Sequence, residues 1–67
     1  MTDEENQLIQ VLQPYGDAFK EDPVATIAAA AEQFGFDPSS PAAVNDFCAG
    51  LSRYAQLIGD TDLVTKI

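Results

Sequence analysis

Carboxylates are the side chains of this sequence with the greatest capacity for chemistry, because eleven of its 67 residues are aspartate or glutamate and none is histidine. Paired carboxylates act as general acid and base when their surroundings split their pKa values. These acids fall mainly at expected helix starts and in loops, where water solvates them. A serine in a nucleophile-elbow setting and a glycine-rich phosphate loop are also missing. We therefore predict no catalytic residues, no cofactor and a protein that is not an enzyme.

Asp60 and Asp62 are the nearest approach to a metal site in the sequence. A calcium loop of the EF-hand type needs a glycine at its sixth position and a glutamate at its twelfth, and the residues after Asp60 supply neither. Capping of a last helical turn is the favoured role of Asp60. Cys48 shares a helical stripe with Val44 and Leu51, which favours burial of its thiol. We predict no metal site.

The first helix is expected to begin at Thr2, where a threonine followed by three acids, with Glu5 at the third helical position, is typical of a capping box. Its apolar residues recur at helical spacing: Leu8, Val11, Leu12, Tyr15 and Phe19. Pro14 lacks an amide hydrogen and clashes with the carbonyl four residues earlier. We expect the helix to stop or kink near Gln13, with a short turn over 15–19.

The second helix is bracketed by Asp22 and Pro23 at its start and by Gly35 at its end. An apolar stripe at helical spacing is expected to be its buried face, formed by Val24, Ile27, Ala28, Ala31 and Phe34.

The third helix is expected from Ser40 and Pro41 to Gly59. It is predicted to bury a longer stripe: Val44, Phe47, Cys48, Leu51, Tyr54, Ala55 and Ile58. A last short turn through Leu63 and Val64, capped by Asp60 or Thr61, is expected to fray.

No segment alternates polar and apolar residues at the spacing of a strand, and no linker or repeat interrupts the chain. We predict one all-α domain over 1–67. It is a small compact bundle of three main helices, the first one kinked or broken at Pro14, with a short C-terminal helical turn.

The charge balance excludes several classes of partner. Only Lys20, Arg53 and Lys66 oppose the eleven acids, so the net charge of -8 repels nucleic acid and anionic lipid. A secretory signal and an apolar run of about 20 residues are missing. The single Cys48 fits a reducing compartment. We expect a cytoplasmic protein that binds neither nucleic acid nor a membrane directly.

The positions of acidic and of small residues on the expected helices predict two candidate protein-binding surfaces. If the first two helices pack antiparallel, six acids are expected to form an acidic edge: Asp3, Glu4, Glu5, Asp17, Glu21 and Asp22. Small residues opposite the core stripes of the second and third helices would allow another helix to approach closely. These small-residue faces comprise Ala25, Ala29, Ala30, Ala42, Ala49 and Ser52, beside Gly50.

The leading hypothesis is a non-enzymatic acidic protein–protein interaction module, such as an adaptor, an assembly factor or a small subunit of a complex. Its partner would carry a basic surface, or the protein would associate with itself. The alternative is a small acidic inhibitor, for example one encoded by a phage, that blocks a basic or nucleic-acid-binding surface of a host protein.

Overall fold

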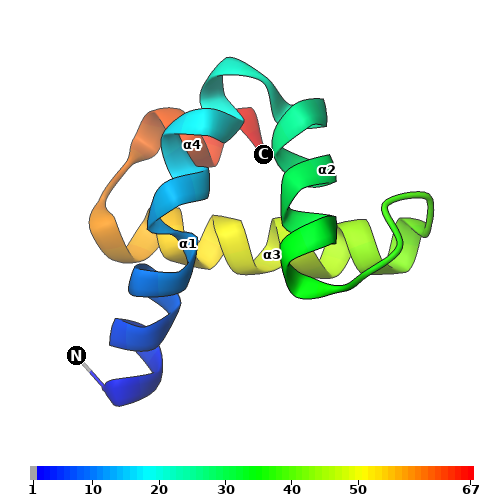
Figure 1. The fold of residues 1–67 in the computed structure, drawn as a ribbon. Coiled ribbons are helices and arrows are strands. Elements are labelled where there is room, and N and C mark those ends of the chain that lie inside the picture. Colours follow the sequence, from blue (N-terminus) through cyan, green and yellow to red (C-terminus); the bar gives the residue numbers. More distant parts are fainter. Residues whose placement is uncertain (1) are drawn as a thin grey trace.

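The computed structural model describes residues 2–67, which form helices joined by short connections (Figure 1). The helices are α1 (Asp3–Glu21), α2 (Pro23–Phe34), α3 (Pro41–Ile58) and α4 (Thr61–Lys66). The described residues contain no strand. The predicted all-α fold, with three main helices and a short C-terminal one, is therefore confirmed.

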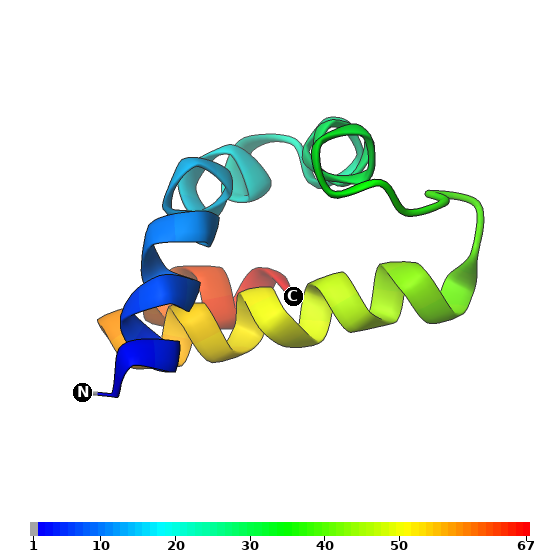
Figure 2. The same ribbon diagram turned by 60° about the horizontal axis from the view of Figure 1, so that its bottom comes forward.

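Helix α1 is the centre of the fold, because it packs against α2, α3 and α4. The second half of α1 lies beside α2 and runs antiparallel to it, and α3 crosses beneath both (Figures 1 and 2). Helix α4 fills the remaining corner against α1 and α3. The core lies where these helices meet and consists of Leu12, Phe19, Ala30, Phe47, Leu51, Tyr54, Ala55 and Leu63.

Local capping sets the helix boundaries as the sequence predicts. The Glu5 amide donates to Thr2 Oγ1 over 3.2 Å, and the Thr2 amide donates to Glu5 Oε1 over 3.1 Å, which completes the capping box of α1. The Asp22 side chain caps α2. Gly35 and Gly59 end α2 and α3 in the left-handed conformation, with φ of 77° and 74°.

Helix α1 continues through Pro14, so the expected short turn over 15–19 is wrong. The two halves of the helix run in different directions (Figure 2). A proline inside a helix costs about 3 kcal/mol. Burial of one large apolar side chain returns about 1.5–3 kcal/mol, and α1 buries Leu12 before the proline and Phe19 after it. Packing on both sides therefore keeps the helix continuous.

The predicted buried stripe of α2 is wrong at Val24, Ala28 and Phe34, which are exposed, Val24 by 78%. Ala31 is buried and Ile27 packs against the core, as predicted, and the small residues Thr26 and Ala30 are buried beside them. Small side chains let α2 approach α1 closely, and this preference outweighs the spacing of the large apolar residues. Thr26 is buried without an unpaired hydroxyl, because its Oγ1 donates to the Asp22 carbonyl over 2.8 Å.

The expected fraying of the C-terminal turn is also wrong. Leu63 is fully buried, and α4 packs against α1 and α3. Asp60 caps α4, as predicted, because its Oδ1 accepts a hydrogen bond from the Leu63 amide over 3.2 Å. Packing against the core therefore stabilises α4, which is too short to be stable by itself.

Gly16 lies in close contact with the helices that neighbour α1. A Cβ atom at this position would lie 2.9 Å from Tyr54 Cε2 and 3.5 Å from Leu63 Cδ2. Because Tyr54 is buried, its ring has little room to move aside. Gly50, within α3, differs, since a Cβ there would meet only Leu12 Cδ1, at 4.0 Å.

We expect alanine substitutions at these two glycines to change stability in opposite directions. Gly50→Ala should stabilise the protein by about 0.5–1 kcal/mol, because alanine costs less backbone entropy than glycine in a helix. Gly16→Ala should destabilise it by about 1–3 kcal/mol, because the added methyl overlaps Tyr54. Urea unfolding followed by circular dichroism measures both. Equal stabilisation by both substitutions would contradict the close contact at Gly16.

Candidate functional site

An open apolar groove lies on the described surface. It has a volume of about 380 Å³ and lies between the first half of α1, the end of α2 with the loop after it, and α3. Its lining comprises Leu8, Val11, Leu12, Phe34, Phe36, Ala43, Asp46, Phe47 and Gly50. Asp46 is the one charged residue among them. We refer to this set of nine residues as the apolar groove.

Two large side chains of the apolar groove are half-exposed. Val11 is 42% exposed and Phe34 is 44% exposed. Phe34 is part of an aromatic cluster, with ring centroids 5.6 Å from Tyr15 and 6.5 Å from Phe47. Such aromatic pairs contribute about 0.5–1.5 kcal/mol beyond burial alone. The wall of the groove is therefore stabilised by ring contacts and still presents apolar surface to solvent.

Phe36 reaches the groove because the end of α2 fixes the chain that carries it. The amides of Gly35 and Phe36 both donate to the Ala31 carbonyl, over 2.8 and 3.1 Å, as in a Schellman motif. The Phe36 ring then packs 5.9 Å from that of Phe47.

Gly50 contributes an opening in the α3 side of the groove. The left-handed glycines of the described chain are Gly35 and Gly59, so the backbone of Gly50 does not require glycine. Neither does its packing, since an added Cβ would make only an ordinary contact with Leu12. A glycine inside a helix costs about 0.5–1 kcal/mol relative to alanine. Its effect here is to leave the α3 backbone open to the groove.

The structure separates the predicted acidic edge into two groups at opposite ends of α1, about 25 Å apart along the helix. One group is Asp3, Glu4 and Glu5, and the other is Asp17, Glu21 and Asp22. Hydrogen bonds from the Thr2 backbone amide and hydroxyl hold the pKa of Glu5 below its ordinary value. Asp22 caps α2. The six acids therefore do not form one continuous array.

The predicted small-residue faces are also divided. Ala30 is fully buried in the core, so it does not belong to an outer surface. Ala25 and Ala29 line a second hollow of about 320 Å³ between α1 and α2, together with Glu21 and Asp22 from the predicted acidic edge.

On α3, Ala42 and Ala49 are exposed and Ser52 is half-buried. Ala42 lies four residues before Asp46 and Ala49 three residues after it, so both border the groove wall along the helix surface.

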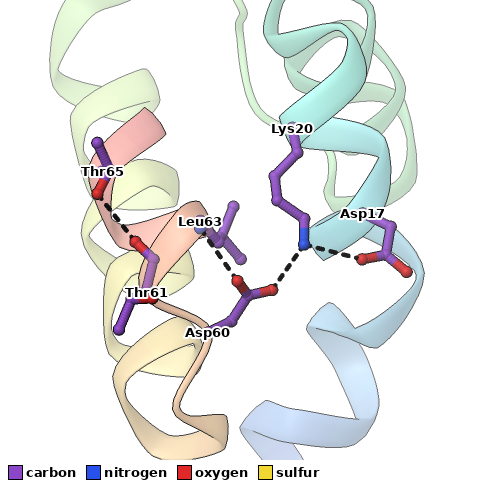
Figure 3. A network of polar contacts seen from close by, with 6 residues as sticks. All are labelled: Asp17, Lys20, Asp60, Thr61, Leu63 and Thr65. Carbon is purple, nitrogen blue, oxygen red and sulfur yellow. Dashed lines mark hydrogen bonds and ion pairs between the residues drawn. The ribbon is translucent and has the colours of Figure 1, made fainter.

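Lys20 joins the end of α1 to the start of α4 (Figure 3). Its Nζ donates to Asp60 Oδ2 over 2.8 Å and lies 3.3 Å from Asp17 Oδ1. The hydrogen bond to Asp60 raises the pKa of Lys20, and the same bond, with the Leu63 amide bond, lowers the pKa of Asp60. Each of these shifts favours the charged form, which is typical of a structural ion pair.

Cys48 is half-buried, and burial raises the pKa of its thiol. A protonated thiol is a weak nucleophile and a weak metal ligand. In the described part of the chain, no group of three or more His, Cys, Asp or Glu side chains is arranged to hold a metal ion.

Among residues 2–67, no helix combines the length and the hydropathy that crossing a bilayer requires.

The sequence patterns did not identify the groove, because five of its residues belong to apolar stripes expected to face the core: Leu8, Val11, Leu12, Phe34 and Phe47. Gly50 lies beside one of the predicted small-residue faces. A glycine in the middle of a helix marks either a close contact or an open wall, and Gly16 and Gly50 both fit that pattern, so the sequence does not distinguish them.

No protein-family model, no curated protein and no solved structure matches this chain.

We expect Asp60→Asn to lower the melting temperature at neutral pH more than Asp62→Asn does. Asparagine still caps a helix, so the first substitution mainly removes the ion pair with Lys20. Because the folded pKa of Asp60 lies below its ordinary value of 3.8, the ion pair stabilises the fold above that pH. This contribution is lost as the pH falls through the lower, folded value.

Lys20 sets the upper pH limit of this stabilisation. Its pKa in the folded protein lies above the ordinary value of 10.5, so the contribution of the ion pair is lost as the pH rises from 10.5 through the folded pKa. Thermal unfolding at a series of pH values measures the difference between the two variants. A difference that persists unchanged in strong acid would contradict the assigned ion pair.

Proposed function

We propose that this protein is a non-enzymatic protein–protein interaction module, and that the apolar groove is its binding surface. The observation that carries the proposal is the exposure of Val11 and Phe34 in an open hollow of about 380 Å³. Contiguous exposed apolar surface beside polar residues is typical of interaction sites. Energetically dominant interface contacts are commonly large apolar anchors in well-packed hollows.

The shape of the hollow supports a macromolecular partner over a small substrate. Small-molecule sites enclose most of their ligand and place several polar groups around it. The groove is open to solvent, and Asp46 is the only charged group in its lining. An adaptor, an assembly factor or a small subunit of a complex fits this chemistry.

The acidic-inhibitor hypothesis remains the second proposal, supported by the net charge of -8. It would use the acids as a mimic of a phosphate array, with a basic or nucleic-acid-binding surface as its target. The division of those acids between the two ends of α1 gives this hypothesis less geometric support than the groove gives the first.

Capture from an extract of the native host tests the proposed function with two matched variants. Val11→Asp places a charge in the groove, whereas Val24→Asp places the same charge on an exposed valine of α2 outside it. We expect the immobilised protein and Val24→Asp to retain the same partner. Val11→Asp should retain at least about tenfold less, since a buried unpaired charge costs more than 1.4 kcal/mol.

Circular dichroism establishes that both variants keep their helices, and mass spectrometry identifies the retained protein. Equal retention by Val11→Asp and Val24→Asp, or no specific retention by the unmodified protein, would overturn the proposal.

A further inference from the structure

We infer that the occupant of the apolar groove is a basic amphipathic helix of another protein, whose apolar face docks against Val11 and Phe34 while its lysine or arginine side chains pair with Asp46 and Glu4. This inference rests on the proposed function and adds the chemistry of the partner. Four observations support it: the residues that line the groove, the carboxylates at the groove, the net charge of the whole chain, and the glycine at position 50.

The lining of the groove favours a helix over an extended peptide. All the lining residues except Phe36 belong to helices, and the described chain contains no strand whose edge could pair with another backbone. An extended segment in such a hollow would leave amide and carbonyl groups unpaired, which is costly away from water. A helix satisfies its own backbone hydrogen bonds, so it can present an apolar face without that cost.

The charges at the groove favour a basic occupant. Asp46 is exposed within the lining, and none of the described residues that line the groove is basic. Glu4 lies one turn before Leu8 on α1, so it places a second exposed carboxylate next to a lining residue.

Neither of these two acids has an ion-pair partner in the described structure. Lys20 is engaged by Asp17 and Asp60. Arg53 and Lys66 are the other bases of the chain, and neither makes an ion pair with Asp46 or Glu4 among the described residues.

The overall charge favours a different protein over a second copy of this chain. Two copies that each carry a net charge of -8 repel one another over distances of about 8–10 Å at ordinary ionic strength. The same field accelerates the approach of a positively charged helix and orients it before contact.

Gly50 fits this occupant because it lets a partner side chain approach the α3 backbone. Glycine at this position is required neither by backbone conformation nor by packing within the chain. Close helix–helix approach at small residues is a common packing device. A larger side chain at Gly50 would fill the groove from its α3 side while leaving the net charge unchanged.

A designed peptide tests the occupant directly. It is an amphipathic helix of about 18 residues with leucines at i, i+3, i+4 and i+7 spacing and lysines on the flanks of the leucine stripe. The first comparison peptide replaces the lysines by glutamates. The second keeps the lysine composition but scatters the leucines around the helix. Binding is measured by fluorescence anisotropy, and the site is mapped by amide chemical-shift changes.

We expect the lysine peptide to bind at least about tenfold more tightly than either comparison peptide, with its preference over the glutamate peptide shrinking as salt is raised. Shift changes should centre on the groove, over residues 8–12, 34–36 and 46–50. Gly50→Leu should weaken binding about tenfold or more at unchanged net charge. Asp46→Asn should weaken it about two- to fivefold, as for an exposed ion pair.

Several results would overturn the inference. The lysine peptide could bind no more tightly than the glutamate peptide or than the scattered-leucine peptide. The shift changes could lie outside the groove, or Gly50→Leu could bind the lysine peptide as tightly as the unmodified protein does. Each leaves the capture experiment with Val11→Asp free to succeed, so failure here is distinguishable from failure of the proposed function. Concentration-dependent dimerisation through the groove, seen by sedimentation, would identify a second copy as the occupant and would also overturn the inference.

Discussion

The close contact of α1 with Tyr54 and Leu63 at Gly16 is the constraint on which the rest of this structure depends. It brings α1 against α3 and α4 at once, at a separation that no side chain larger than hydrogen permits without movement. The contact lies two residues after Pro14, so it requires the helix to continue past its proline. Burial of Phe19 beyond that point supplies stabilisation comparable to the cost of the proline.

The same constraint explains why a groove exists. The second half of α1 is held against α2, α3 and α4, whereas its first half, before Pro14, takes another direction across α3 (Figure 2). Leu8 and Val11 lie on this first half, and they line the groove together with α3 and the aromatic residues at the end of α2. The first half of α1 therefore carries more apolar surface than the rest of this small chain covers. A chain of this length buries roughly 60% of its unfolded surface, so an uncovered apolar region is physically reasonable.

Helix ends could be predicted from the sequence where neighbouring residues set them. The capping box of Thr2 and Glu5, the Asp22 cap and the terminal glycines Gly35 and Gly59 act within a few residues. The continuation of α1 past Pro14 and the burial of individual side chains depend on distant contacts, so they could not be predicted.

Val24 and Ala31 fit the same periodic stripe, yet one is exposed and the other buried, because α2 meets α1 through small residues. Gly16 and Gly50 likewise look equivalent in sequence. Only the fold shows that the first is packed against Tyr54 and the second borders open space. The groove could not be predicted for this reason.

Much of the acidity of the chain serves local structure. Glu5, Asp22 and Asp60 cap helices, and Asp17 lies beside Lys20. Asp46 and Glu4 differ, because both are exposed, Asp46 within the groove lining and Glu4 one turn before the lining residue Leu8. The proposed recognition therefore uses an apolar surface with nearby carboxylates rather than the total negative charge.

The central claim, that the apolar groove receives the partner, is tested most directly by intermolecular nuclear Overhauser effects in the complex of this labelled protein with its captured partner. We expect effects from the rings of Phe34 and Phe36 and the methyl groups of Val11 to apolar side chains of one partner helix. Effects confined to Ala25 and Ala29 in the hollow between α1 and α2 would contradict the claim.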